Sequence, residues 1–146
     1  MTRINVGIDP KTLTDEHLLA EHREIKRICS RLIKRNGILD GAPKKFTLGA
    51  GHELFFLRYG KYTYDRYLNI RYECEFRGFN VTNYIDNWKC YNLFPDLYND
   101  YNPTQCDIKL IKDRISYRIS NSSKNYFHYY GNRISKNDAI KLISNE

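Results

Sequence analysis

The chain has 146 residues, which fits one domain, because domains commonly hold roughly 100 to 150 residues. Its 24 Lys and Arg against 17 Asp and Glu give a net charge of +7, which favours a polyanionic partner without naming it. No apolar run could span a membrane and no secretory signal pattern opens the chain, so we expect a cytoplasmic protein that is not secreted. The four cysteines and four histidines match no zinc spacing, which disfavours a metal enzyme and predicts reduced thiols.

The clearest predicted helix runs from Asp15 to Asn36. Its apolar residues fall on one arc of the helical wheel: Leu18, Ile25, Ile28, Cys29, Leu32 and Ile33. The opposite arc holds His17, Ala20, Arg23, Glu24, Arg27 and Arg31. Between positions 23 and 45 the chain carries eight Lys and Arg against two acidic residues, a local charge of +6. The sequence therefore predicts a basic helix face that carries one carboxylate.

The rest of the chain offers weaker signals. A second helix is predicted over Lys61–Arg77, between two glycines, and a third from Pro103 to about Ser120, with isoleucines at core spacing. The segment Thr82–Pro103 has no consistent period and could contain a short helical turn. After an aromatic cluster at 126–130, the polar tail could add a helical turn over 138–143.

These elements predict an all-α fold. We expect a compact single domain, residues 1–146, of about three helices with long irregular connections. Strand signals are scarce along the chain, and residues from about 132 to 146 read as a C-terminal extension.

Thr2 and Glu24 are the candidates for covalent chemistry. If Met1 is removed, Thr2 has a free α-amine, and an amine with a pKa of about 7.7 to 8.0 is partly neutral at physiological pH. A neutral amine can form a Schiff base when an acid or base nearby moves protons. Taken singly, both signals are ordinary, because many chains begin Met-Thr and a glutamate among arginines is more often an ion-pair partner.

Several ordered segments together resemble the pyrimidine-dimer DNA glycosylase and abasic-site lyase family. They span residues 1 to about 131: Met1–Asn5, His17–Glu24 with Arg27, Phe46–His52 with Phe55 and Phe56, Arg77–Asn80, and Tyr129–Gly131. The resemblance implies three helices, with an N-terminus that threads between them to reach a catalytic carboxylate. It also implies duplex DNA with ultraviolet lesions as the partner, base excision repair as the role, and no metal or cofactor.

The resemblance assigns roles to individual residues. The Thr2 amine would attack C1′ of the 5′ sugar of a cyclobutane pyrimidine dimer and expel the base, and Glu24 would move protons during β-elimination. Arg3, Arg23 and Arg27 match phosphate-holding positions, and His17 matches the rim of the active site. The remaining expected DNA contacts are Arg31, Arg114, Arg118, Tyr129 and Tyr130.

The sequence departs from the family pattern beside the expected site, and two alternatives stay open. Glu16 stands where the family usually has Gln, while Tyr126 and His128 stand where it commonly has Trp and Lys. The same chemistry could act on another damaged or modified base. Alternatively, the basic segment could belong to a non-catalytic DNA-binding module. In each case we expect a monomer.

Overall fold

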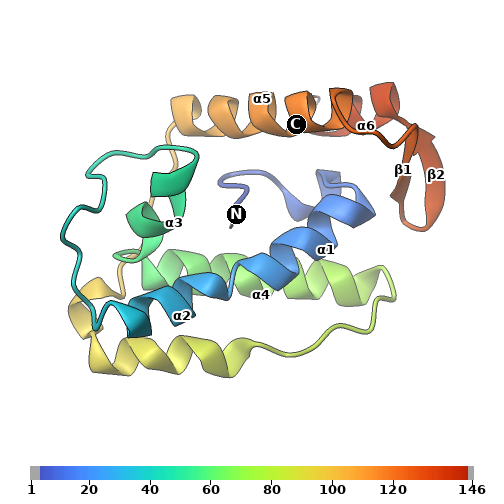
Figure 1. Ribbon diagram of the computed structural model, residues 1–146. Coiled ribbons are helices and arrows are strands. Elements are labelled where there is room, and N and C mark those ends of the chain that lie inside the picture. The colour runs from blue at the N-terminus through green and yellow to red at the C-terminus, as the bar shows by residue number, and fades with distance from the viewer. Residues whose placement is uncertain (1–3, 145–146) are drawn as a thin grey trace.

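The computed structural model describes residues 4–144 and is mostly helical (Figure 1). Six α-helices lie within that range: α1 (Asp15–Glu24), α2 (Arg27–Lys34), α3 (Ala50–Phe56), α4 (Gly60–Phe76), α5 (Gln105–Ser120) and α6 (Lys136–Ser144). Strand β1 (Tyr126–Tyr129) pairs antiparallel with β2 (Asn132–Ser135). The prediction of a mostly helical fold is confirmed, but that of about three helices without a sheet is wrong. None of the helices in the described part is long and apolar enough to cross a membrane.

The predicted first helix is in fact two, α1 and α2. Between them the backbone hydrogen bonds shorten to three residues, since Ile28 N–H donates to Ile25 O and Cys29 N–H to Lys26 O. This tighter turn changes the rotation per residue. As a result α2 directs Leu32 into the core and leaves Ile33 59% exposed, so the expectation of Ile33 on the buried stripe is wrong.

Helices α4 and α5 lie close to their predicted positions. At the start of α5, the Thr104 hydroxyl accepts from Asp107 N–H and the Asp107 carboxylate accepts from Thr104 N–H, which is a capping box. The sequence suggested Pro103 as the first residue of this helix. In the structure Pro103 instead precedes the capping residue Thr104. The unperiodic segment before it contains a 3₁₀ helix, Ile85–Leu93, and a 3₁₀ turn, Pro95–Leu97.

The C-terminal residues form a hairpin that the sequence did not predict, followed by a helix of which it predicted one turn. Tyr130 and Gly131 both have positive φ, 52° and 79°, which closes the two-residue turn between β1 and β2. Helix α6 then lies along α5, as Figure 1 shows, and buries Ala139 and Ile143 in the same core as the other helices. The predicted helical turn at 138–143 is confirmed as part of α6.

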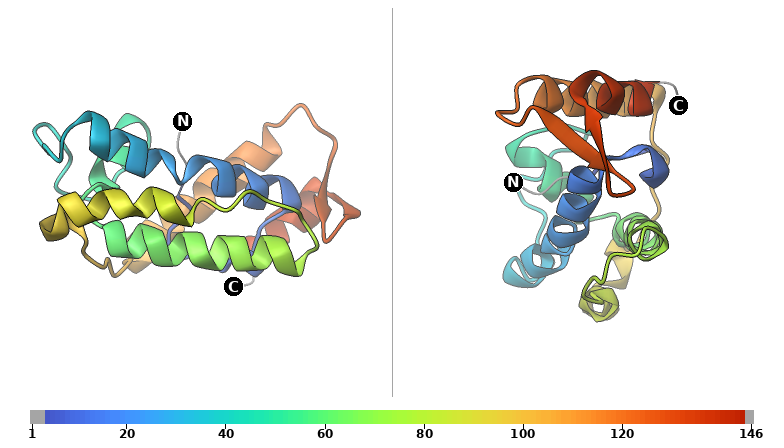
Figure 2. Two further views of the ribbon diagram at one scale, coloured as in Figure 1. Left: turned by 90° about the horizontal axis from the view of Figure 1, so that it is seen from below. Right: turned by 90° about the vertical axis from the view of Figure 1, so that its right-hand side faces the viewer.

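The N-terminal segment runs through the middle of the molecule. Figures 1 and 2 show it between α5 on one side and α1 and α4 on the other. Ile4, Val6 and Ile8 have no exposed surface, and the chain turns at Gly7, where Ile8 N–H donates to Asn5 O. A 3₁₀ turn at Pro10–Thr12 then leads into α1, whose first turn is capped by the Thr14 hydroxyl. The fold thus fixes the chain immediately after Thr2 and Arg3, which lie outside the described residues.

Candidate functional site

His52 holds the start of the N-terminal segment. Helix α3, which carries it, begins after Gly49, whose φ of 75° suits glycine. The Nε2 atom of His52 lies 3.2 Å from the Ile4 nitrogen, and its Nδ1 lies 2.9 Å from the Thr47 carbonyl oxygen. Burial lowers the pKa of His52, and the charge of Arg114 lowers it further, so the imidazole is neutral at pH 7.

A buried ion pair holds the next residues of the segment. The Arg66 guanidinium contacts both carboxylate oxygens of Glu21, at 2.8 and 3.0 Å. The same carboxylate accepts from the Asn5 backbone N–H at 3.2 Å and from the Asn5 amide at 2.8 Å. Arg66 also donates to the Ile8 carbonyl. Helices α1 and α4 therefore hold the N-terminal segment through buried hydrogen bonds with Glu21 and Arg66.

Glu24 lies one helical turn after Glu21, at the end of α1. Residues three apart share a face of a helix, so Glu24 lies on the same face of α1 as Glu21, whose carboxylate holds Asn5. Its side chain is partly buried, and its Oε2 is enclosed without a hydrogen-bond partner among residues 4–144. A buried carboxylate oxygen normally has such a partner. This unsatisfied oxygen makes Glu24 a candidate for the functional site.

The arginines predicted to bind DNA differ in how exposed they are to solvent. Arg23 and Arg27 are exposed on α1 and α2, where they can reach a phosphate backbone. Arg31 is half exposed and pairs with Glu53 at 3.2 Å, so the carboxylate partly neutralises its charge. The guanidinium nitrogens Nη1 and Nη2 of Arg114 are enclosed. Arg114 is therefore not exposed like Arg23 and Arg27, and its charge acts on His52.

His17 and Arg118 meet at a separate hollow. They line a cavity of about 340 Å³ together with Glu16, Ser122, Lys124 and Phe127. The sequence placed His17 on the exposed basic arc, but it is only 6% exposed, because Phe127 of the unpredicted hairpin stacks on its ring at 5.8 Å. That expectation is wrong. The imidazole Nδ1 contacts the Thr14 hydroxyl at 2.7 Å.

Two departures from the family pattern contact each other at this cavity. His128 donates from its backbone N–H to Oε1 of Glu16, and its Nδ1 lies 2.9 Å from Oε2. Burial alone would raise the pKa of Glu16, but the hydrogen bonds from His128 lower it overall. The extra carboxylate is therefore held by the histidine.

The hydroxyls of Tyr129 and Tyr130, two of the expected DNA contacts, form hydrogen bonds within the protein. The Tyr129 hydroxyl donates to Lys11 O at 2.7 Å, and that of Tyr130 donates to Oε2 of Glu73 at 2.6 Å. The Tyr130 ring also covers the guanidinium of Arg77, 4.4 Å from the ring centre. These contacts attach the hairpin to the 3₁₀ turn Pro10–Thr12 and to α4, and both hydroxyls donate within the protein.

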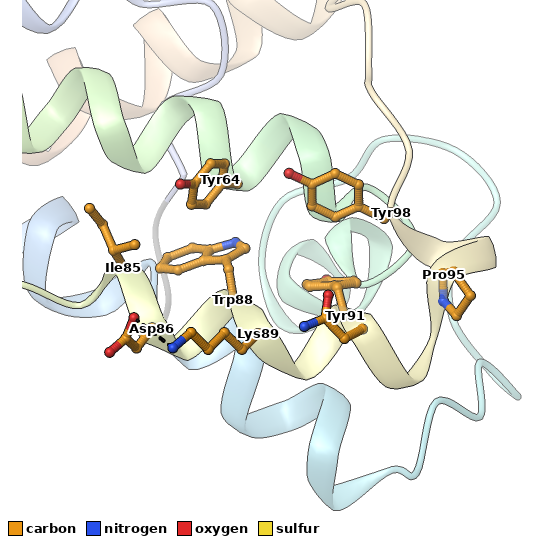
Figure 3. A pocket seen from close by; sticks show the side chains of 9 residues that line it. Tyr64, Ile85, Asp86, Trp88, Lys89, Tyr91, Pro95 and Tyr98 are labelled. Atoms are coloured by element: carbon orange, nitrogen blue, oxygen red, sulfur yellow. Dashed lines mark ion pairs between the residues drawn. The ribbon is translucent and has the colours of Figure 1, made fainter.

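A larger cavity, of about 490 Å³, lies elsewhere, between α4 and the Ile85–Leu93 segment (Figure 3). Aromatic rings surround it, among them Tyr64, Trp88, Tyr91 and Tyr98. The Trp88 indole N–H donates to the Thr63 hydroxyl at 3.0 Å. None of the predicted site residues lines this cavity.

Sequence reasoning missed the groups that hold the N-terminal segment. His52 is in the segment that carried the resemblance, and Glu21 is on the first predicted helix, but neither received a role. Arg66 lies within a tyrosine-rich helix, and no motif or spacing in the sequence indicated a role for it. A buried arginine must be paired, so one on the inner face of α4 could have suggested a buried carboxylate.

The site combines a fixed N-terminal segment, a buried carboxylate oxygen and exposed arginines on a chain of net charge +7. These features are typical of a protein that acts on nucleic acid. The model of the pyrimidine dimer DNA glycosylase family matches residues 1–87, more than half of the chain. The chain belongs to this family, whose activity is that of a DNA glycosylase on pyrimidine dimers. The match includes Thr2, Glu24 and His52, whereas α5 and the hairpin lie beyond it.

Proposed function

We propose that this chain is a DNA repair N-glycosylase with abasic-site lyase activity, and that its nucleophile is the α-amine of Thr2. Its substrate is the cyclobutane pyrimidine dimer in duplex DNA. Such a dimer distorts the stack, which lowers the cost of opening the duplex at the lesion. The chain acts as one domain and as a monomer, inside the cell where its DNA lies.

The first chemical step joins the protein to the sugar. The neutral Thr2 amine attacks C1′ of the 5′ nucleotide, the N-glycosidic bond breaks, and the base leaves with the bonding electrons and gains a proton. The nitrogen loses one proton, the bond between C1′ and the ring oxygen breaks as that oxygen takes the bonding electrons and a proton, and a protonated Schiff base remains. Nearby arginines favour this step because their charge disfavours the ammonium form of the amine.

The second step breaks the strand. The Schiff base acidifies the C2′ proton, a base removes it, and the C3′–O bond breaks by β-elimination. Water then hydrolyses the imine and returns the free amine. Glu24 is the group we assign to these proton transfers, and its negative charge stabilises the cationic imine.

The observation that carries this proposal is the way the N-terminal segment is held beside α1. Ile4 is tied to His52 and Asn5 to Glu21, one turn from the buried oxygen of Glu24. Two residues of extended chain span at most about 7 Å, so covalent geometry alone keeps the Thr2 amine near these contacts. So short a tether restricts where the amine can lie, which supports the proposal because an oriented attack requires a restricted nucleophile.

Borohydride trapping tests the proposal. The reagent reduces an imine to a stable amine, so the protein without Met1 should become covalently attached to dimer-containing duplex DNA. Mass spectrometry of the digested adduct should place the sugar on the Thr2 nitrogen. Protein that retains Met1 has an amide at that nitrogen and should form no adduct through Thr2. If the processed protein forms no adduct, or forms it through a lysine, the proposal is wrong. Parallel reactions on oxidised and plain abasic DNA identify the lesion.

Arg23 and Arg27 should contribute to phosphate binding together with Arg3. Each arginine that contacts a phosphate releases about one counterion, so Arg23→Ala or Arg27→Ala should lower the slope of log Kd against log salt concentration by about 0.9. The measurement is a fluorescence anisotropy titration with duplex DNA at several salt concentrations. Lys141→Ala on α6 is the control, because this exposed lysine lies on a helix at the opposite end of the chain. An unchanged slope for both arginine variants would show that neither contacts a phosphate.

A further inference from the structure

His52 has a buried ring whose orientation is fixed by its neighbours. It has no exposed surface, and the rings of Phe46 and Phe56 pack against it at 5.6 and 5.2 Å, in edge-to-face geometry. Enclosed between aromatic rings and the N-terminal segment, the imidazole has little freedom to turn. The positions of its two nitrogens are therefore set by packing.

The hydrogen bonds determine which nitrogen carries the proton. Nδ1 lies 2.9 Å from the Thr47 carbonyl oxygen, and a carbonyl can only accept, so Nδ1 carries the proton. In the neutral ring, Nε2 then has only a lone pair. It accepts from the Ile4 N–H, at 3.2 Å.

The Ile4 carbonyl oxygen also lies 3.2 Å from this Nε2. With neutral His52 the bond to Ile4 N–H is favourable, whereas the lone pair and the carbonyl oxygen repel each other weakly. Protonation at Nε2 reverses both interactions, because the new N–H would donate to Ile4 O and repel Ile4 N–H. One proton thus changes which backbone atom of Ile4 the ring holds.

We propose that neutral His52 is a positioning residue for the reaction: by accepting from Ile4 N–H it sets the backbone from which the Thr2 amine extends, and its protonation releases that arrangement. This inference rests on the proposed function, since it concerns the same amine. Two charged groups from neighbouring helices act on the ring, Arg114 of α5 and Glu21 of α1, with opposite signs. Burial and Arg114 together lower the pKa of His52 and keep it neutral at physiological pH. The hydrogen bond from Ile4 N–H is therefore lost only when the solution is acidified.

The test compares two substitutions at His52 in the full-length processed protein. His52→Gln can place Oε1 where Nε2 lies and accept from Ile4 N–H, but it does not titrate. His52→Phe keeps a ring of similar shape but has no acceptor. The rate of borohydride trapping is measured at saturating abasic duplex DNA between about pH 5 and 8, with DNA affinity measured separately.

At pH 7.5 we expect His52→Phe to trap about 10- to 100-fold more slowly than the wild type with unchanged DNA affinity, because the amine is displaced. His52→Gln should stay within a few-fold of the wild type. On acidification two groups, the amine and His52, should inactivate the wild type, so log rate should fall with a slope approaching about two. The slope for His52→Gln should stay near one.

Tyr91→Phe is the control for general loss of stability, because it removes a buried hydrogen bond to Leu57 O, away from the site. It should trap like the wild type. Equal trapping rates for the wild type and a folded His52→Phe, or equal acid slopes for the wild type and His52→Gln, would overturn the inference alone. If His52→Phe does not fold, the slope of His52→Gln still decides. Absence of trapping by the wild type would instead refute the proposed function.

Discussion

Glu24→Gln should lower the rate of dimer cleavage by at least about 100-fold while duplex binding remains. Gln keeps the size and the hydrogen-bonding capacity of the side chain but cannot accept a proton or stabilise a cationic imine by charge. General acid–base catalysis contributes about 10²- to 10⁴-fold, which sets the expected loss. The measurement is single-turnover nicking of a duplex with one pyrimidine dimer, together with the Kd for the same duplex.

Glu75→Gln is the matched control for this change. Glu75 lies on α4, is about half exposed and pairs with Arg71 at 3.0 Å, so its substitution removes one negative charge away from the site. It should cleave like the wild type. Equal cleavage by Glu24→Gln and Glu75→Gln would refute the assignment of Glu24 and favour a non-catalytic role for the carboxylate.

Arg66→Met should destabilise the fold by about 3 to 5 kcal/mol, because it leaves the Glu21 carboxylate buried without its counter-charge. For a chain of this size, about 2 to 4 °C of Tm is lost per kcal/mol, so the Tm should fall by about 6 to 20 °C. Thermal unfolding followed by circular dichroism measures the loss. Trapping by the surviving folded protein should also slow, because Asn5 and Ile8 lose part of their support.

Arg71→Met is the comparison for Arg66→Met. Arg71 is on the same helix and also pairs with a glutamate, but both partners are partly exposed to water. Exposed ion pairs contribute about 0 to 1 kcal/mol, so the Tm should change little. Equal losses for the two variants would show that the buried pair does not hold the segment as described.

The helices that the sequence predicted well are those with a local signal at each end. Helix α4 lies between glycines, one of which, Gly78, adopts a φ of 86° after the last turn. Helix α5 has isoleucines at core spacing, and Ile111, Ile115 and Ile119 are buried as that spacing indicates. Local composition was sufficient there.

The hairpin had no comparable signal, because strands of four residues are too short to establish an alternation. Because the hairpin was absent from the predicted fold, the packing of its Phe127 ring on His17 was not foreseen. The split between α1 and α2 was missed for a similar reason, since a change from four- to three-residue hydrogen bonds leaves the apolar pattern nearly unchanged.

The predicted site was partly accessible from sequence. Glu24 and the arginines share one helical region, so periodicity placed them together, and the resemblance supplied Thr2, whose role stays a prediction. The contacts that hold Ile4 and Asn5 join residues 48 and 16 positions apart. Such pairings arise only when the chain folds, and a single buried histidine in a sequence is ordinary.

The buried N-terminal segment has a consequence for how the protein is made. Gly7 lies against Ile108 of α5, so the segment around Gly7 can be enclosed only after about a hundred further residues have been synthesised. At about 5 to 20 residues per second, the N-terminus waits for roughly 5 to 20 s in an open chain. Methionine removal can take place in that interval, before the helices close around the segment. The order of synthesis thus leaves time for Met1 to be removed before the helices enclose the segment that begins at Ile4.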